Sequence, residues 1–274
     1  MKKYSLFNPL LSINVLIQNW DLLVQLTKRN IAMRYRGSAL GLFWSFAQPL
    51  MMLGVYSFVF GIVFKARWGE GIETGGAAFP VIMFCGMAVF NIFSESVNNC
   101  TSVIVGNPSY VKKVIFPLEI LPLTVVAASF IFGLAWFFML LLGVAFFMGH
   151  ISWTMILFPI TFIPLLLLTA GVSYFVASLG VYLRDIQQVV AIITQILFFM
   201  TPIFYPISIV PEKIRWVLEY NPLSSLVEQT RIIFLYGRQP DWLICSIIFL
   251  ASYLVFLIGF AWFSKTKKGF ADVI

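Results

Sequence analysis

Four polar residues recur within one apolar stretch at the spacing of an α-helix. The i, i+4, i+7 and i+11 positions of this stretch are Asn91, Glu95, Asn98 and Ser102. This spacing places them on one helix face, where their amides, carboxylate and hydroxyl could bind a hydroxyl-rich ligand. They could instead join neighbouring helices by hydrogen bonds. A proton relay needs several titratable groups in series, and this stripe offers only one.

Aromatic side chains are a second possible binding chemistry. The chain has 29 Phe, 10 Tyr and 8 Trp, and many of them would face lipid or form the aromatic belt at the membrane interface. Aromatic rings offer stacking faces to sugar rings, and Tyr and Trp add a polar group. The candidate stacking residues are Phe43, Trp44, Tyr56, Phe198, Phe199, Phe204 and Tyr205.

The residue types that most enzymes need are scarce in the sequence. His150 is the only histidine, and the three cysteines, Cys85, Cys100 and Cys245, show no spacing typical of a metal site or a disulfide. Neither G-x-x-x-x-G-K-[ST] nor a G-x-G-x-x-G following a strand occurs. We therefore expect no catalytic residue, no metal and no cofactor in this chain. Any use of ATP would require a separate ATPase.

The composition is that of an integral membrane protein. Hydrophobic residues make up 61% and charged residues 11% of the 274 residues, whereas soluble domains are about 45–50% apolar and 25% charged. The mean hydropathy of +0.95 agrees. Polar residues soon after Lys2 and Lys3 interrupt any apolar run, so we expect no removable signal peptide.

The elements that would position these residues are six membrane-spanning helices. Apolar runs of about 20 residues or more are long enough to cross the ~30 Å hydrocarbon core. The runs are 37–64, 79–105, 120–148, 151–183, 186 to about 210, and 242–263. Six spans put both termini on one side, and 12 of the 18 Lys and Arg residues then lie on that side. The positive-inside rule therefore places both termini in the cytoplasm.

Two segments outside the spans have amphipathic patterns. Before the first span, polar residues from Gln18 to Arg36 recur opposite an apolar face, which predicts a helix lying in the inner interface. Topological anchoring alone would also explain its basic residues. Between about 205 and 241, short apolar pieces alternate with Pro and Gly breaks, which predicts re-entrant outer gate helices. We therefore expect an N-terminal segment 1–36, a permease domain 37–263 and a tail 264–274.

The inner loop 106–117 predicts a short helix after Pro108 that carries Lys112 and Lys113. From its residues alone, it could be a re-entry turn with two anchoring lysines. Its sequence, however, resembles that of a known family, the membrane subunits of ABC systems that export surface polysaccharides such as O-antigen, with teichoic-acid and capsule relatives. The resemblance extends over nearly the whole chain, and its segments include RYRGS at 34–38, LGLFW at 40–44, QPL at 48–50, 107–122, 183–185, 201–205, 209–211 and 221–223, with Arg231.

The resemblance implies a dimer of six-span subunits that export a glycan linked to undecaprenyl pyrophosphate. A cytoplasmic ABC ATPase would bind ATP and Mg²⁺, and the loop would be its coupling helix. The implied coupling residues are Asn107, Tyr110, Val111, Lys112, Lys113 and Phe116. The cations available for the pyrophosphate are Lys28, Arg29, Arg34 and Arg36. The expected channel lining is Asn91, Glu95, Asn98, Tyr56, Phe198, Phe199 and Tyr205. The implied location is the bacterial inner membrane, and no nucleic-acid partner is expected.

Other interpretations remain open from the sequence. An ABC exporter of this kind could carry teichoic acid, capsule, a drug or a lipid. A membrane-embedded enzyme acting on lipid-linked sugars would need acidic or metal-binding loops, and an ion-coupled transporter would be expected to show internal repeats, which are absent from the sequence. A homodimer is favoured by the frequency of two-fold symmetry. Gly37 and Gly41, spaced as G-x-x-x-G, would permit close helix packing in it.

Overall fold

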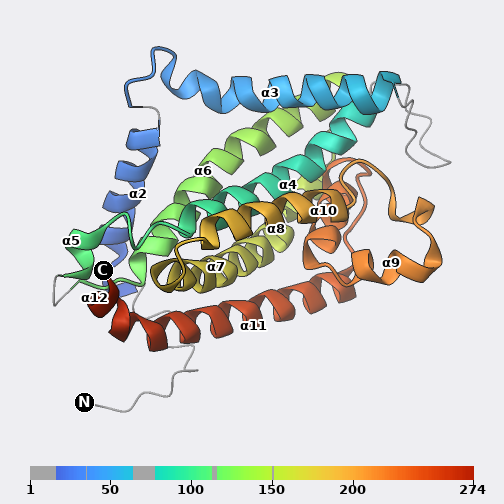
Figure 1. Cartoon of the computed structure of the whole chain (residues 1–274). Coiled ribbons are helices and arrows are strands. Elements are labelled where there is room, and N and C mark those ends of the chain that lie inside the picture. Colours follow the sequence, from blue (N-terminus) through green and yellow to red (C-terminus); the bar gives the residue numbers. More distant parts are fainter. Residues whose placement is uncertain (1–16, 35, 64–77, 113–115, 150) are drawn as a thin grey trace.

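The computed structural model describes residues 17–34, 36–63, 78–112, 116–149 and 151–274 (Figure 1). Every regular element within these ranges is a helix. Five of them are long and apolar enough to cross a membrane. The prediction of an all-α membrane protein is therefore confirmed. Five of the six predicted spans correspond to these long helices.

The five long elements match five of the predicted spans. Helix α3 (Trp44–Tyr56) continues as a π-helix (Ser57–Val63), and α6 (Ile120–Gly143) continues as a second π-helix (Val144–Met148). A short 3₁₀ segment (Trp153–Leu157) precedes α7 (Pro159–Tyr182). The other two are α4 (Ala78–Cys100) and α11 (Trp242–Thr266). Helix α4 is the most buried of the five, between α6, α7, α8 and α10, and α3 is the least buried.

The fifth predicted span, 186 to about 210, is shorter in the structure. Helix α8 (Ile186–Met200) has 15 residues, or about 22 Å at 1.5 Å per residue, against a hydrocarbon core of ~30 Å. A bend over residues 201–205 follows it, and then a 3₁₀ turn (Ile207–Ile209). The prolines at 202 and 206 end the helix because they cannot donate a backbone hydrogen bond.

The direction of neighbouring helices nevertheless favours a sixth crossing. Helices α7 and α11 run parallel, since Ser178 bonds Thr266 through their hydroxyls at 2.7 Å, and the Tyr182 hydroxyl donates to the Thr266 carbonyl at 2.9 Å. Their C-terminal ends therefore lie together, and the chain from 183 to 241 must return to the opposite end before α11 begins. Helix α8 begins this return (Figure 1). Six spans remain a prediction that this geometry supports.

The short helices lie at the two ends of the bundle. Helix α2 (Trp20–Arg34), α5 (Pro108–Val111) and α12 (Phe270–Val273) lie at one end, and α9 (Glu212–Glu219) lies at the other (Figure 1). Helix α10 (Pro222–Phe234) packs back against α4. It begins where the Asn221 side chain accepts a hydrogen bond from the Leu223 amide at 3.0 Å, and Pro222 suits the first turn. Helix α2 packs against α6 through Leu23 and Leu26, while Trp20 is 59% exposed.

The structure gives three details that the sequence does not. Gly37 and Gly41 have φ of +84° and +50°, so both have left-handed backbone conformations before α3 begins. The prediction that they form a G-x-x-x-G helix-packing motif is therefore wrong. The described helix in the 106–117 loop is only α5, with four residues. The tail 264–274 is helical and packed, with Phe270 fully buried and Lys267 paired with Glu119. The predictions for residues 1–16, Lys113 and His150 lie outside the described residues.

Candidate functional site

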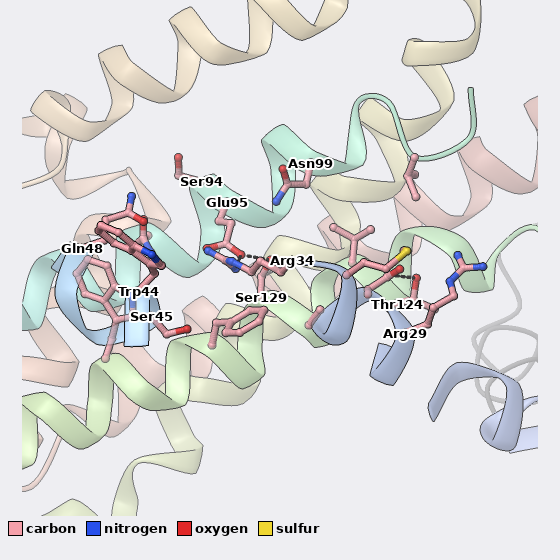
Figure 2. A pocket seen from close by; sticks show the side chains of 18 of the residues that line it. Arg29, Arg34, Trp44, Ser45, Gln48, Ser94, Glu95, Asn99, Thr124 and Ser129 are labelled. Atoms are coloured by element: carbon pink, nitrogen blue, oxygen red, sulfur yellow. Dashed lines mark hydrogen bonds and ion pairs between the residues drawn. The ribbon is translucent and has the colours of Figure 1, made fainter. Parts of the chain in front are cut away.

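A polar cavity of about 660 Å³ opens between α2, α3, α4 and α6, close to the end of the bundle that carries α5 (Figure 2). Twelve of its wall residues carry amide, hydroxyl, guanidinium or carboxylate groups. They are Arg29, Asn30, Arg34, Ser45, Gln48, Asn91, Ser94, Glu95, Asn99, Asn107, Thr124 and Ser129. We call this space the polar cavity. Its volume lies within the ~300–1,000 Å³ range of ordinary ligand sites.

An ion pair closes one side of the polar cavity. Both oxygens of Glu95 accept from the Arg34 guanidinium, with 3.0 Å between Nη2 and Oε2, and the Ser129 hydroxyl donates to Oε1 at 3.0 Å. The guanidinium carbon also lies 4.1 Å from the centre of the Phe132 ring, a cation–π distance. This bidentate contact ties the end of α2 to α4 and α6 (Figure 2).

A second arginine links the polar cavity to the α5 loop. Arg29 Nη1 donates to the Tyr110 hydroxyl at 2.7 Å, and the Tyr110 ring stacks on Phe116 with 4.4 Å between ring centres. Asn107 lines the cavity and donates to the Val103 carbonyl at 2.9 Å. Arg29 and Asn107 therefore connect this loop to the cavity wall.

A second space, which we call the aromatic cavity, lies beside the polar one. It has about 340 Å³ and lies between α3, α4 and α8. Its walls share Gln48, Asn91, Ser94 and Trp136 with the polar cavity. The rest of its lining includes Tyr56, Phe90, Phe198 and Phe199. Phe204 lies 5.2 Å from Tyr56 and 5.1 Å from Phe198 between ring centres, and thus packs on the rings of this wall.

Comparison with known proteins assigns the chain to a family. The sequence profile of the ABC-2 type transporter family matches residues 21–235. The chain belongs to the ABC-2 type transporters. It is thus a multi-pass membrane transport subunit, as the sequence resemblance implied.

Named relatives cover almost the full length of this ABC-2 chain. It is 31% identical over 262 residues to the O-antigen export system permease protein RfbA of Myxococcus xanthus, covering 94% of this chain and 97% of the relative. It is 28% identical over 260 residues to the protein of that name from Klebsiella pneumoniae, covering 93% and 95%. The polysialic acid transport protein KpsM of Escherichia coli is 22% identical over 245 residues, covering 88% and 91%.

The structure brings together most of the predicted lining residues of this ABC-2 subunit. Asn91 and Glu95 line the polar cavity, and Asn91 also lines the aromatic cavity with Tyr56, Phe198 and Phe199. Asn98 and Tyr205 line neither. The Asn98 amide donates to the Ser94 carbonyl at 2.7 Å and the Thr194 hydroxyl at 3.0 Å, which joins α4 to α8. The Tyr205 hydroxyl donates to the Phe199 carbonyl at 2.8 Å.

The predicted polar stripe is therefore divided between two roles. Asn91 and Glu95 face the cavities, Asn98 joins two helices, and Ser102 lies beyond the end of α4 on the surface. Sequence reasoning missed Ser94 and Asn99, which lie on α4 between these positions, and Gln48 on α3. Helical periodicity could have included Ser94 and Asn99, because both fall within one turn of Glu95.

The predicted cations and coupling residues differ in burial and in whether they line the polar cavity. Arg29 and Arg34 line the polar cavity, whereas Lys28 and Arg36 are exposed beside it along the chain. In the loop, Lys112 is exposed, Val111 is buried and Asn107 is half-buried. The loop therefore has an exposed part, at Lys112, and a buried part, at Val111.

A buried arginine anchors segment 201–241 of the ABC-2 chain. Arg231 on α10 is fully buried. Its Nη2 donates to the Ile203 carbonyl at 3.1 Å, and its Nη1 lies 3.4 Å from Glu228 Oε2. Its Nε donates to the Ile82 carbonyl at 3.4 Å. These bonds fix α10 to the bend after α8 and to the start of α4.

Proposed function

We propose that this chain is the permease of an ATP-driven exporter of O-antigen-type polysaccharide. The observation that carries the proposal is the similarity to O-antigen export permeases over 93–94% of the chain. The two adjacent cavities suit such a cargo, because amides and hydroxyls bond sugar hydroxyls and aromatic rings stack on sugar faces. The chain contributes transport and no catalysis.

The partner that hydrolyses ATP is a separate ABC ATPase, which carries the ATP and Mg²⁺. This part of the proposal rests on the missing phosphate-binding pattern in the sequence and on the exposed α5 loop. The ATPase seats against Asn107, Tyr110, Val111, Lys112, Lys113 and Phe116. Movement of the loop then reaches the polar cavity through the bond between Tyr110 and Arg29.

The cargo enters as a glycan on undecaprenyl pyrophosphate. Lys28 and Arg36 are exposed and offer first contacts to the pyrophosphate, and Arg29 and Arg34 receive it at the cavity wall. Charge-assisted hydrogen bonds from guanidinium groups suit a pyrophosphate. The chain lies in the bacterial inner membrane with both termini in the cytoplasm, where the excess of basic residues belongs.

The functional unit is a homodimer. Helix α3 and the π-helix that continues it leave large apolar side chains uncovered, among them Met51, Phe58 and Ile62, each more than half exposed. Part of this surface meets a second copy, and closed two-fold dimers are the commonest arrangement of identical subunits.

Gentle purification of the tagged chain from its native membranes tests the proposal. We expect an ATPase with a Walker motif to co-purify in stoichiometric amount, and its hydrolysis to rise when O-antigen-type glycan on undecaprenyl pyrophosphate is added. A stable oligomer that contains no ATPase would refute the proposal.

A second cargo is favoured by one observation, the similarity to a capsule polysaccharide permease at 22% identity. The same assay separates the two cargoes. Stimulation by a capsule glycan and not by O-antigen-type glycan would keep the exporter and replace its cargo.

A further inference from the structure

A third hollow runs along α3 on the side away from α8. It has about 470 Å³ and lies between α3, the first turns of α4 and the end of α6. We call it the apolar groove. Its walls include Leu50, Leu53, Gly54, Phe84, Met139 and Phe146. Ser57 is the only lining residue with a polar side chain that the structure describes there. Such a lining accepts hydrocarbon and rejects sugar or charge.

The apolar groove adjoins the polar cavity end to end. On α3, Pro49 lines the polar cavity and the next residue, Leu50, lines the groove. On α6 the polar cavity uses residues 121–136 and the groove uses 139–143. The border is a stacked pair, Phe84 and Trp136, with 5.3 Å between ring centres. The seam between α3 and α6 therefore changes from polar to apolar with increasing distance from α2.

The charged residues of the polar cavity indicate which chemical group it would bind. Two guanidinium groups, of Arg29 and Arg34, and one carboxylate, of Glu95, face this space, which leaves a net positive charge. Among the described residues, none bonds the side-chain amides of Gln48, Asn91 or Asn99, which also line it. A polar, net-positive space beside a hydrocarbon groove fits an anionic lipid with a long chain.

We propose that α3 separates the spaces that bind the different parts of the substrate. The hydrocarbon chain of the lipid carrier lies in the apolar groove between α3 and α6, and its anionic head lies in the polar cavity. The glycan leaves on the other side of α3, through the aromatic cavity beside α8. Gln48, which lines both the polar and the aromatic cavity, stands where head and glycan part (Figure 2). This inference rests on the proposed function, because it takes the lipid-linked glycan as substrate.

The groove offers a substitution that fills it without disturbing the fold. A Cβ atom added at Gly54 would have nothing within 4 Å, and this glycine has no unusual φ. The Gly54→Leu side chain therefore extends into empty groove. Its neighbour Val55 is 56% exposed and lines none of the three hollows. Val55→Phe adds the same number of carbon atoms on the outer face of α3 and is the matched control.

The test measures the binding of undecaprenyl pyrophosphate and of geranyl pyrophosphate, a short chain with the same head, to the complete exporter in lipid nanodiscs. We expect the wild type to bind the long chain about tenfold more tightly, because added methylene groups are buried. Gly54→Leu should abolish most of this preference and leave the short chain unaffected, while Val55→Phe should behave as wild type. If Gly54→Leu does not assemble, Ser57→Leu fills the same groove.

Three results would overturn the inference, in distinguishable ways. If Gly54→Leu keeps the chain-length preference, the chain lies elsewhere and the proposed cargo stands. If the variant loses both ligands equally, the groove does not bind the chain separately from the head. If the wild type binds neither pyrophosphate, the lipid-linked cargo of the proposed function fails as well.

Discussion

Helices α3 and α11 are both apolar spans, yet they are packed in opposite ways. Helix α11 lies against α7 so closely that a Cβ at Gly259 would stand 2.1 Å from the Gly171 carbonyl oxygen. Around Gly54 of α3, a Cβ would meet nothing within 4 Å. The polar cavity, the aromatic cavity and the apolar groove all use α3 as a wall, and none includes a residue of α7 or α11.

The difference indicates which helices form the structural scaffold and which helices bind the substrate. Close backbone contact through small residues stabilises a helix pair in a membrane by van der Waals packing, and it leaves no room for a ligand. A loosely packed helix leaves concave spaces on both sides. We infer that the α7–α11 pair supports the subunit, while the surroundings of α3 bind the cargo.

The same substitution should have opposite consequences in the two regions. Gly259→Ala forces α7 and α11 apart, since the new Cβ meets backbone and not a flexible side chain. We expect a loss of about 3 kcal/mol in the free energy of unfolding. Gly54→Ala should leave stability unchanged or slightly higher. Thermal unfolding in detergent, followed by size-exclusion chromatography, measures both. Equal losses of stability in Gly259→Ala and Gly54→Ala would contradict the difference in packing between α11 and α3.

Segment 201–241 is part of the scaffold if Arg231 anchors it. Arg231→Met leaves the Ile203 carbonyl without this donor in a buried place, and we expect a cost of about 2 kcal/mol. Arg238, exposed on the same segment, gives the control Arg238→Met, which should cost little. Urea unfolding of the two variants tests this. An undisturbed Arg231→Met would show that α10 is held by apolar packing alone.

On the α3 side, breaking an ion pair should change binding more than stability. Glu95→Gln removes the bidentate partner of Arg34, whose side chain is 31% exposed, so we expect a stability loss under about 1 kcal/mol. The freed guanidinium should bind pyrophosphate about threefold more tightly, because Glu95 no longer competes for it. Titration with geranyl pyrophosphate measures the change, with Ser129→Ala as the control. Weaker binding would mean that Glu95 itself positions the head.

The smallest effect on stability is expected at the α5 loop. Lys112 is exposed and forms no described ion pair. Replacement of Lys112 and Lys113 by Ala should leave the folded amount unchanged and uncouple ATP hydrolysis from export. Parallel assays of hydrolysis and glycan transport in the purified complex check this. Export with normal coupling would show that the lysines only anchor the loop.

The sequence predicted the spans well because five of the six runs have no charged residue and the run 79–105 has only Glu95. It predicts Tyr56, Phe198 and Phe199 as channel lining, and the structure places all three on the wall of the aromatic cavity. It could not separate Asn98 from Asn91, because periodicity gives a helix face and not the neighbour that covers it. Asn98 faces Thr194 on α8, and Asn91 faces open space.

The remaining errors have local physical causes. Gly37 and Gly41 have the spacing of a helix-packing motif, but their positive φ values are a property of the backbone that spacing cannot show. The apolar groove was invisible in sequence, because its lining resembles the lipid-facing residues of any span. The ion pair between Arg34 and Glu95 joins residues 61 positions apart. The sequence predicts Arg34 as a pyrophosphate ligand and Glu95 as channel lining, and it does not predict their contact.

Transport itself tests the central claim most directly. The chain and its co-purified ATPase are reconstituted into liposomes, and labelled O-antigen-type glycan on undecaprenyl pyrophosphate is supplied on the side that carries the ATPase. The account predicts that the glycan appears on the opposite side only when ATP is hydrolysed, and that Gly54→Leu slows this transfer while Val55→Phe does not. A complex that hydrolyses ATP at the normal rate but leaves the glycan where it was supplied would contradict the account.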